Sequence, residues 1–91
     1  MMKVYLVFYG LEKKPRFRGP FDLCVRYIFE NCRDGENIQS ITEELKSNEG
    51  IFRNYLVISR DEIEGYVAFT GNLDDKYDRI SDYWKDKGYL K

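Results

Sequence analysis

The sequence predicts an α+β protein in which a three-stranded mixed sheet carries two to three helices, in the order β-α-α-β-β-α. Short runs of β-branched and aromatic residues predict strands at residues 4–9, 52–59 and 63–70. Apolar residues repeat at helical spacing within residues 22–32, 38–47 and 73–87. The chain has 91 residues, of which 43% are hydrophobic and 16% aromatic, so we expect a single compact domain over residues 1–91.

The first predicted strand has no polar face. Residues 4–9 read VYLVFY, and both alternating faces carry apolar or aromatic side chains. This pattern is typical of a central strand that is covered on both sides. Gly10 ends the strand, and we expect residues 11–20 to form a loop because Pro15 and Pro20 oppose regular pairing.

Two helices are predicted next. Asp22 is the expected N-cap of the first helix, and its expected buried residues are Cys24, Val25, Ile28, Phe29 and Cys32. For the second helix, over residues 38–47, either Asn37 is the cap or Ser40 and Glu43 form a capping box. Its expected inward contacts are Ile38, Ile41 and Leu45, and a turn is expected at residues 48–50.

The remaining elements are a hairpin and a helix. Three residues separate the strands predicted at 52–59 and 63–70, which favours an antiparallel pair. Because about forty residues separate the first strand from this hairpin, the connection has room for a crossover that would pair the first hairpin strand in parallel with residues 4–9. The hairpin edge either pairs with a second copy, which would make a homodimer, or is covered by the final helix. That helix is expected over residues 73–87, with Asn72 as its cap, Gly88 as its stop, and an apolar stripe of Leu73, Tyr77, Ile80 and Trp84.

Several classes of function are disfavoured by composition. The chain has no histidine, which is the commonest general base and metal ligand, so we expect no enzyme, no metal site and no cofactor. The carboxylates of Asp61, Glu62 and Glu64 fall at the predicted hairpin turn, where solvated acids are ordinary. A net charge of −1 also disfavours a general nucleic-acid binder.

The two cysteines suggest a reduced environment. If Cys24 and Cys32 lie on one helix, their Cα atoms are roughly 12 Å apart along its axis, too far for a disulfide. The sequence contains no apolar run as long as a membrane span and no recognisable secretory signal. We therefore expect a cytoplasmic protein whose cysteines fill space in the core.

A basic segment is one of two candidate sites. Residues 13–18 place four cations around one aromatic ring, and the candidate ligand-binding residues are Lys14, Arg16, Phe17 and Arg18. Such a segment can bind the phosphates of a nucleotide while the ring stacks on its base, or bind RNA or DNA directly. The alternative is a solvated loop whose Phe17 packs back onto the core.

An acidic row is the second candidate site. Aspartates recur every fourth residue in the final helix, at Asp74, Asp78, Asp82 and Asp86. Each step of about 6 Å along a helix is close to the phosphate spacing of a nucleic acid, so this face can imitate one and enter a basic groove on another protein. Tyr83, expected to be exposed beside the row, would add binding energy. The alternative is a charged face that serves only solubility.

Part of the sequence resembles the small accessory proteins of bacteriophages and prophages. The resemblance covers the first third, through the strand segment at residues 3–7 and the Gly-Pro-Phe-Asp step at residues 19–22 before a helix. It implies a compact αβ protein of the host cytosol, of a kind that in some cases blocks host defences by binding a nuclease, a glycosylase or a signalling molecule. We therefore expect a non-enzymatic phage-type inhibitor of a host protein with a basic groove, and alternatively a nucleotide-binding sponge that uses residues 13–18.

Overall fold

The computed structural model describes residues 3–32, 35–63 and 80–88. The α+β class is confirmed. The strands are β1 (Tyr5–Tyr9), β2 (Phe17–Gly19), β3 (Ile51–Phe52) and β4 (Tyr55–Ser59). The helices are α1 (Phe21–Asn31), α2 (Ile38–Ser47), α3 (Arg60–Ile63) and α4 (Ile80–Asp86). Within these residues, no helix is both long and apolar enough to cross a membrane.

Within the described part of the chain, the sheet has four antiparallel strands in the order β2-β1-β4-β3, so the prediction of three strands in a mixed sheet is wrong. The first strand after α2 is β3, which runs in the same direction as β1 but is not its neighbour, and the hairpin after β3 reverses the chain before β4 pairs with β1. As a result β4 runs opposite to β1, from the pair Tyr5 and Ser59 to the pair Tyr9 and Tyr55. Both edge strands are short, which limits the backbone they offer for pairing with another chain.

Strand β2 lies within the segment that was predicted to be a loop. The two prolines flank this strand and do not interrupt it, since Phe17–Gly19 pairs with β1 between them. The Arg16 amide already donates to the Val7 carbonyl oxygen at 2.7 Å. Proline beside an edge strand removes no hydrogen bond from the interior of the sheet.

The segment predicted as one strand over residues 52–59 is a tight hairpin. Residues 53 and 54 form its turn, with Arg53 at φ 55°, and Phe52 pairs with Tyr55. The predicted second hairpin strand, at residues 63–70, is wrong at its start because Ile63 belongs to α3, and residues 64–70 lie outside the described part. The Ser59 hydroxyl accepts a hydrogen bond from the Glu62 amide at 3.3 Å, so Ser59 caps a helix where a turn was expected.

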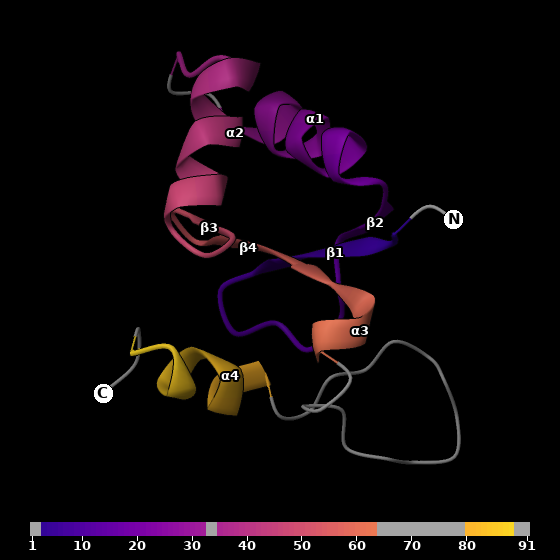
Figure 1. Ribbon diagram of the computed structural model, residues 1–91, viewed down its shortest axis with the longest axis vertical. Coiled ribbons are helices and arrows are strands. Elements are labelled where there is room, and N and C mark those ends of the chain that lie inside the picture. Colours follow the sequence, from indigo (N-terminus) through magenta and orange to yellow (C-terminus); the bar gives the residue numbers. More distant parts are fainter. Residues whose placement is uncertain (1–2, 33–34, 64–79, 89–91) are drawn as a thin grey trace.

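The sheet is covered on both faces, as Figure 1 shows, with α1 and α2 on one side and α3 and α4 on the other. One cluster of buried side chains joins the sheet to α1 and α2, including Val7, Ile28, Ile41 and Phe52. The other joins Leu6, Phe8, Leu56 and Ile58 to Ile63, Ile80, Tyr83 and Trp84. Leu6, Val7 and Phe8 of β1 are fully buried, which confirms a central strand covered on both faces.

The first helix begins without a side-chain cap. Pro20 precedes it in extended conformation, and its carbonyl oxygen accepts from the Leu23 and Cys24 amides. Asp22 lies in the first turn, so its prediction as N-cap is wrong, although an acid there suits the helix dipole. Cys24, Val25 and Ile28 are buried as predicted, whereas Phe29 is exposed.

The second helix uses the first of the two expected caps. The Asn37 side chain accepts from the Ser40 amide at 2.7 Å, while the Ser40 hydroxyl bonds to Glu36. Ile41 and Leu45 are buried as predicted, but Ile38, in the first turn, is exposed. The final helix is confirmed from Ile80 to Asp86, whereas residues 73–79 of its predicted span and the predicted cap Asn72 lie outside the described part. Gly88 follows it at φ 82°, as expected of a C-terminal stop.

Candidate functional site

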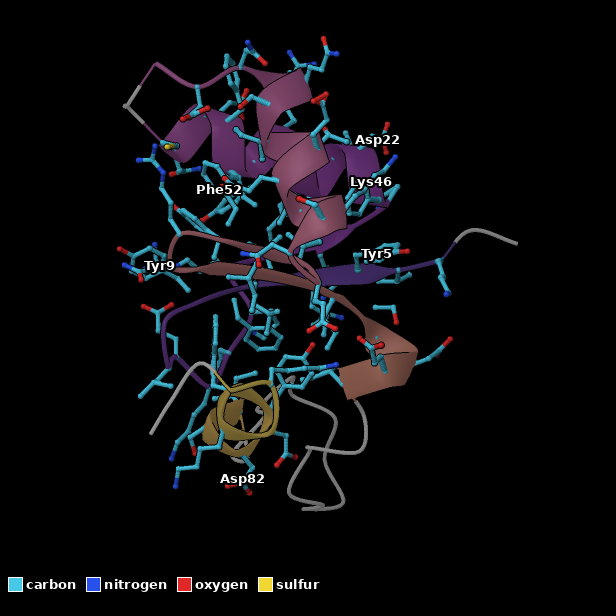
Figure 2. All side chains as sticks on the ribbon, turned by 60° about the vertical axis from the view of Figure 1, so that its left-hand side comes forward. Tyr5, Tyr9, Asp22, Lys46, Phe52 and Asp82 are labelled. Atoms are coloured by element: carbon cyan, nitrogen blue, oxygen red, sulfur yellow. The ribbon has the colours of Figure 1, made fainter. Side chains whose placement is uncertain are left out.

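The C-terminal half of the acidic row lies on α4. Asp82 is half-buried and Asp86 is exposed, whereas Asp74 and Asp78 lie outside the described residues. The opposite side of α4 carries Ile80, Tyr83 and Trp84, all buried against the sheet. Figure 2 shows Asp82 at the side of α4 that faces away from the sheet. The buried stripe therefore fixes which side of the helix these carboxylates occupy.

Tyr83 does not lie beside the acidic row as an exposed residue, and that expectation is wrong. Its side chain is only 2% exposed and belongs to the core cluster between α4 and the sheet. Lys87 places its Nζ atom 5.7 Å from the centre of the Tyr83 ring. The spacing of three from Ile80 is itself a helical core spacing, and this signal could have identified Tyr83 as buried.

The basic segment uses two of its candidate residues for internal contacts. Both Nε and Nη2 of Arg16 donate to the Glu12 carboxylate at 2.8 Å, and the guanidinium lies 4.5 Å from the centre of the Tyr9 ring. The hydrogen bonds from Arg16 lower the pKa of Glu12. Phe17 stacks on Tyr27, with ring centroids 5.3 Å apart, and packs against the core.

The sequence left open whether Phe17 binds a ligand or packs onto the core, and in the structure it packs onto the core. Lys14 and Arg18 are exposed at its surface, Lys14 in the loop and Arg18 on β2. Tyr27 already occupies one face of the Phe17 ring, so that face is not open to a nucleotide base. The four candidate residues therefore do not form a preformed cradle for a nucleotide.

A pocket that the sequence did not reveal lies at the tip of the β3–β4 hairpin. Its volume is about 440 Å³, and we call it the hairpin-tip pocket, lined by Gly10, Leu11, Asn48, Ile51, Arg53, Asn54 and Trp84. The Trp84 Nε1–H donates to the Gly10 carbonyl oxygen at 3.0 Å, which ties α4 to the end of β1. Three segments distant in sequence, at residues 10–11, 48–54 and 84, meet here, so no local motif could have indicated the pocket.

The described residues contain no group of three or more cysteine or acidic side chains that could hold a metal ion. Cys24 and Cys32 are both free thiols, Cys24 buried and Cys32 partly exposed. Burial raises the pKa of the Cys24 thiol to about 12, with a smaller contribution from Asp22. Its sulfur lies 3.6 Å from the Gly19 carbonyl oxygen and 3.7 Å from that of Tyr5, so Cys24 fills space in the core as predicted.

The two thiols should differ sharply in reactivity. A pKa near 12 leaves roughly one thiolate in ten thousand at about pH 8, so Cys24 should not react with a thiol reagent in the folded protein. We expect one fast-reacting thiol per native chain and two after denaturation. Cys32→Ser should abolish the fast reaction and Cys24→Ser should retain it. Fast reaction of both thiols in native protein would contradict the burial of Cys24.

The chain matches no protein-family model, no curated protein and no solved structure, so its function has to be argued from its own residues.

Proposed function

We propose that this chain is a non-enzymatic binding protein that inhibits a host defence or nucleic-acid-processing protein. The proposed contact is the outward side of α4, which enters a basic groove of that partner. The observation that supports this proposal is the orientation of α4. Ile80, Tyr83 and Trp84 hold its inner side against the sheet, and Asp82 and Asp86 lie at positions directed away from that contact.

The spacing of the α4 carboxylates suits a basic groove on a partner protein that otherwise binds the phosphates of a nucleic acid. Asp82 and Asp86 are four residues apart, which corresponds to about 6 Å along a helix axis. Because Tyr83 is buried, no tyrosine of α4 contributes an exposed aromatic anchor. Binding should therefore depend mainly on electrostatic complementarity, which speeds association and weakens steeply as salt is added.

The biological setting of the proposal is a phage-type protein in the cytosol of a host cell. The resemblance of the first third to phage accessory proteins supports it, as do the two free thiols. The nucleotide-sponge alternative at residues 13–18 has less support, because Arg16 pairs with Glu12 and Phe17 packs on Tyr27.

Neutralising the two described aspartates should weaken the proposed complex. For the double variant Asp82→Asn/Asp86→Asn, we expect retention of the partner to fall about tenfold, because each lost carboxylate removes a complementary charge. Immobilised protein would be exposed to bacterial lysate, and retained proteins would be quantified with and without added duplex DNA. A partner that binds the acidic side should be released by DNA, which competes for the same basic groove.

The matched control also removes two negative charges, but from α2, on the opposite face of the sheet. Glu43 and Glu44 are exposed on α2, so Glu43→Gln/Glu44→Gln should retain the partner at the wild-type level. Thermal unfolding would verify that both double variants are folded. If the aspartate variant retained the DNA-sensitive partner as well as wild type, the α4 contact would be wrong. If both variants lost it equally, net charge alone would account for binding.

A further inference from the structure

We propose that the hairpin-tip pocket binds a mononucleotide-like organic anion, meaning a flat heterocycle that carries one anionic group. Its volume of about 440 Å³ falls within the range of roughly 300–1,000 Å³ found for small-molecule sites. The proposal goes beyond the protein-binding function above and uses neither of its proposed contact residues, Asp82 and Asp86. Trp84 reaches the pocket from the inner side of α4, whereas Asp82 and Asp86 belong to the outward side.

The charge of the lining favours an anion. Among the described residues that line the pocket, Arg53 is the one that carries a charge, and none is acidic. Two contacts hold the Arg53 side chain in place. Its Nη2 pairs with the Glu36 carboxylate at 3.2 Å, and its guanidinium carbon lies 5.2 Å from the centre of the Phe52 ring. A phosphate or carboxylate can accept hydrogen bonds from a guanidinium in the planar arrangement that such pairs prefer.

The rest of the lining suits a flat ring with polar edges. Leu11, Ile51 and Trp84 supply apolar surface, and Leu11 remains 53% exposed although it lies over the pocket. Asn48 and Asn54 bring two carboxamides to the lining, and the Asn48 Nδ2 donates to the Ile51 carbonyl oxygen at 3.2 Å. The Asn54 carboxamide is of a kind that can both donate to and accept from the edge of a heterocycle. A few polar groups around an apolar wall are the usual composition of a small-molecule site.

The backbone conformation of Arg53 is a second, independent observation that supports a binding site at this turn. Arg53 adopts φ 55°, a left-handed conformation that costs a non-glycine residue roughly 1 kcal/mol or more. Glycine or asparagine would form the hairpin turn more easily. Strained residues of this kind concentrate at functional sites, and here the strained residue carries the only charge among the described residues that line the pocket.

Trp84 makes the proposal directly measurable, because it is the only tryptophan in the chain and lines the pocket. Three probes separate the contributions: AMP has both ring and anion, adenosine has the ring alone, and ribose 5-phosphate has the anion alone. AMP should change Trp84 emission saturably, with a dissociation constant in the millimolar range or tighter. Adenosine and ribose 5-phosphate should each bind about tenfold more weakly. Calorimetry would confirm the affinities.

Arg53→Asn tests the site itself, since asparagine tolerates the left-handed conformation and should preserve the turn. This variant should lower the affinity for AMP about tenfold and leave the affinity for adenosine unchanged. Arg26→Asn on α1 is the matched control, because Arg26 is exposed and does not line the pocket, and it should bind AMP as wild type does. Three results would each overturn the proposal: no saturable response to AMP, equal affinity for all three probes, or unchanged AMP affinity in Arg53→Asn.

Discussion

Gly50→Ala is expected to lower the free energy of unfolding by about 2–4 kcal/mol, through left-handed strain and overpacking together. Gly50 adopts φ 88°, and a Cβ atom placed on it would lie 2.4 Å from the Val57 carbonyl oxygen. That oxygen is backbone, so no side chain can rotate away to relieve the contact. The Gly50 carbonyl oxygen also accepts from the Val57 amide at 2.8 Å, and relaxation would stretch this bond.

A matched glycine separates the two causes. Gly88 has a similar φ of 82°, but a Cβ atom there would meet nothing within 4 Å among the described residues. Gly88→Ala should therefore cost only the left-handed strain, about 1–2 kcal/mol. Urea unfolding followed by circular dichroism would measure both variants. Equal losses for Gly50→Ala and Gly88→Ala would contradict the close approach of Gly50 to β4.

The behaviour of Gly50 illustrates what local sequence can predict. A turn at residues 48–50 was expected from composition alone, and it is present. The tightness of that turn depends on Val57, which lies seven residues later and approaches only because β3 and β4 pair. Local patterns predict that a chain turns, whereas the cost of a substitution depends on which strand packs against the turn.

The same distinction explains the fold. The central strand and the buried residues Cys24, Val25 and Ile28 of α1, with Ile41 and Leu45 of α2, were predicted because their apolar spacing is local. Strands β2 and β3 were missed because two or three residues carry no periodic signal, and their pairing is set by β1 and β4. The prediction of a mixed sheet was wrong because the direction of a strand depends on how often the chain reverses before it, and each of the short strands β2 and β3 adds a reversal.

The candidate sites were predictable only as groups of similar residues. The spacing of four identified the acidic row, but it did not reveal that Tyr83 belongs to the buried stripe. The cluster of cations at residues 13–18 did not reveal that Glu12 pairs with Arg16 or that Tyr27 stacks on Phe17. The hairpin-tip pocket combines residues from position 10 to position 84, and only tertiary structure brings them together.

Trp84→Ala should be at least as destabilising as Gly50→Ala, with a loss of about 3–5 kcal/mol in the free energy of unfolding. The Trp84 side chain is only 6% exposed and packs with Leu6, Phe8 and Leu56 of the sheet. Its removal leaves a cavity beneath α4, and the Gly10 carbonyl oxygen loses its indole donor. Since whole domains are stable by only about 5–15 kcal/mol, this single change should bring the protein close to unfolding.

Two further variants divide the effect of Trp84 into its parts. Trp84→Phe keeps an aromatic ring but removes the hydrogen bond to the Gly10 carbonyl oxygen, so it should lower the free energy of unfolding by about 1–2 kcal/mol. Leu11→Ala changes an exposed apolar residue of the same pocket and should cost less than about 1 kcal/mol. Circular dichroism in urea is the suitable measurement, because two of these variants lack the fluorescent indole. If Trp84→Ala unfolded at the wild-type urea concentration, α4 would not be part of the core, and the outward orientation of Asp82 and Asp86 would lose its physical basis.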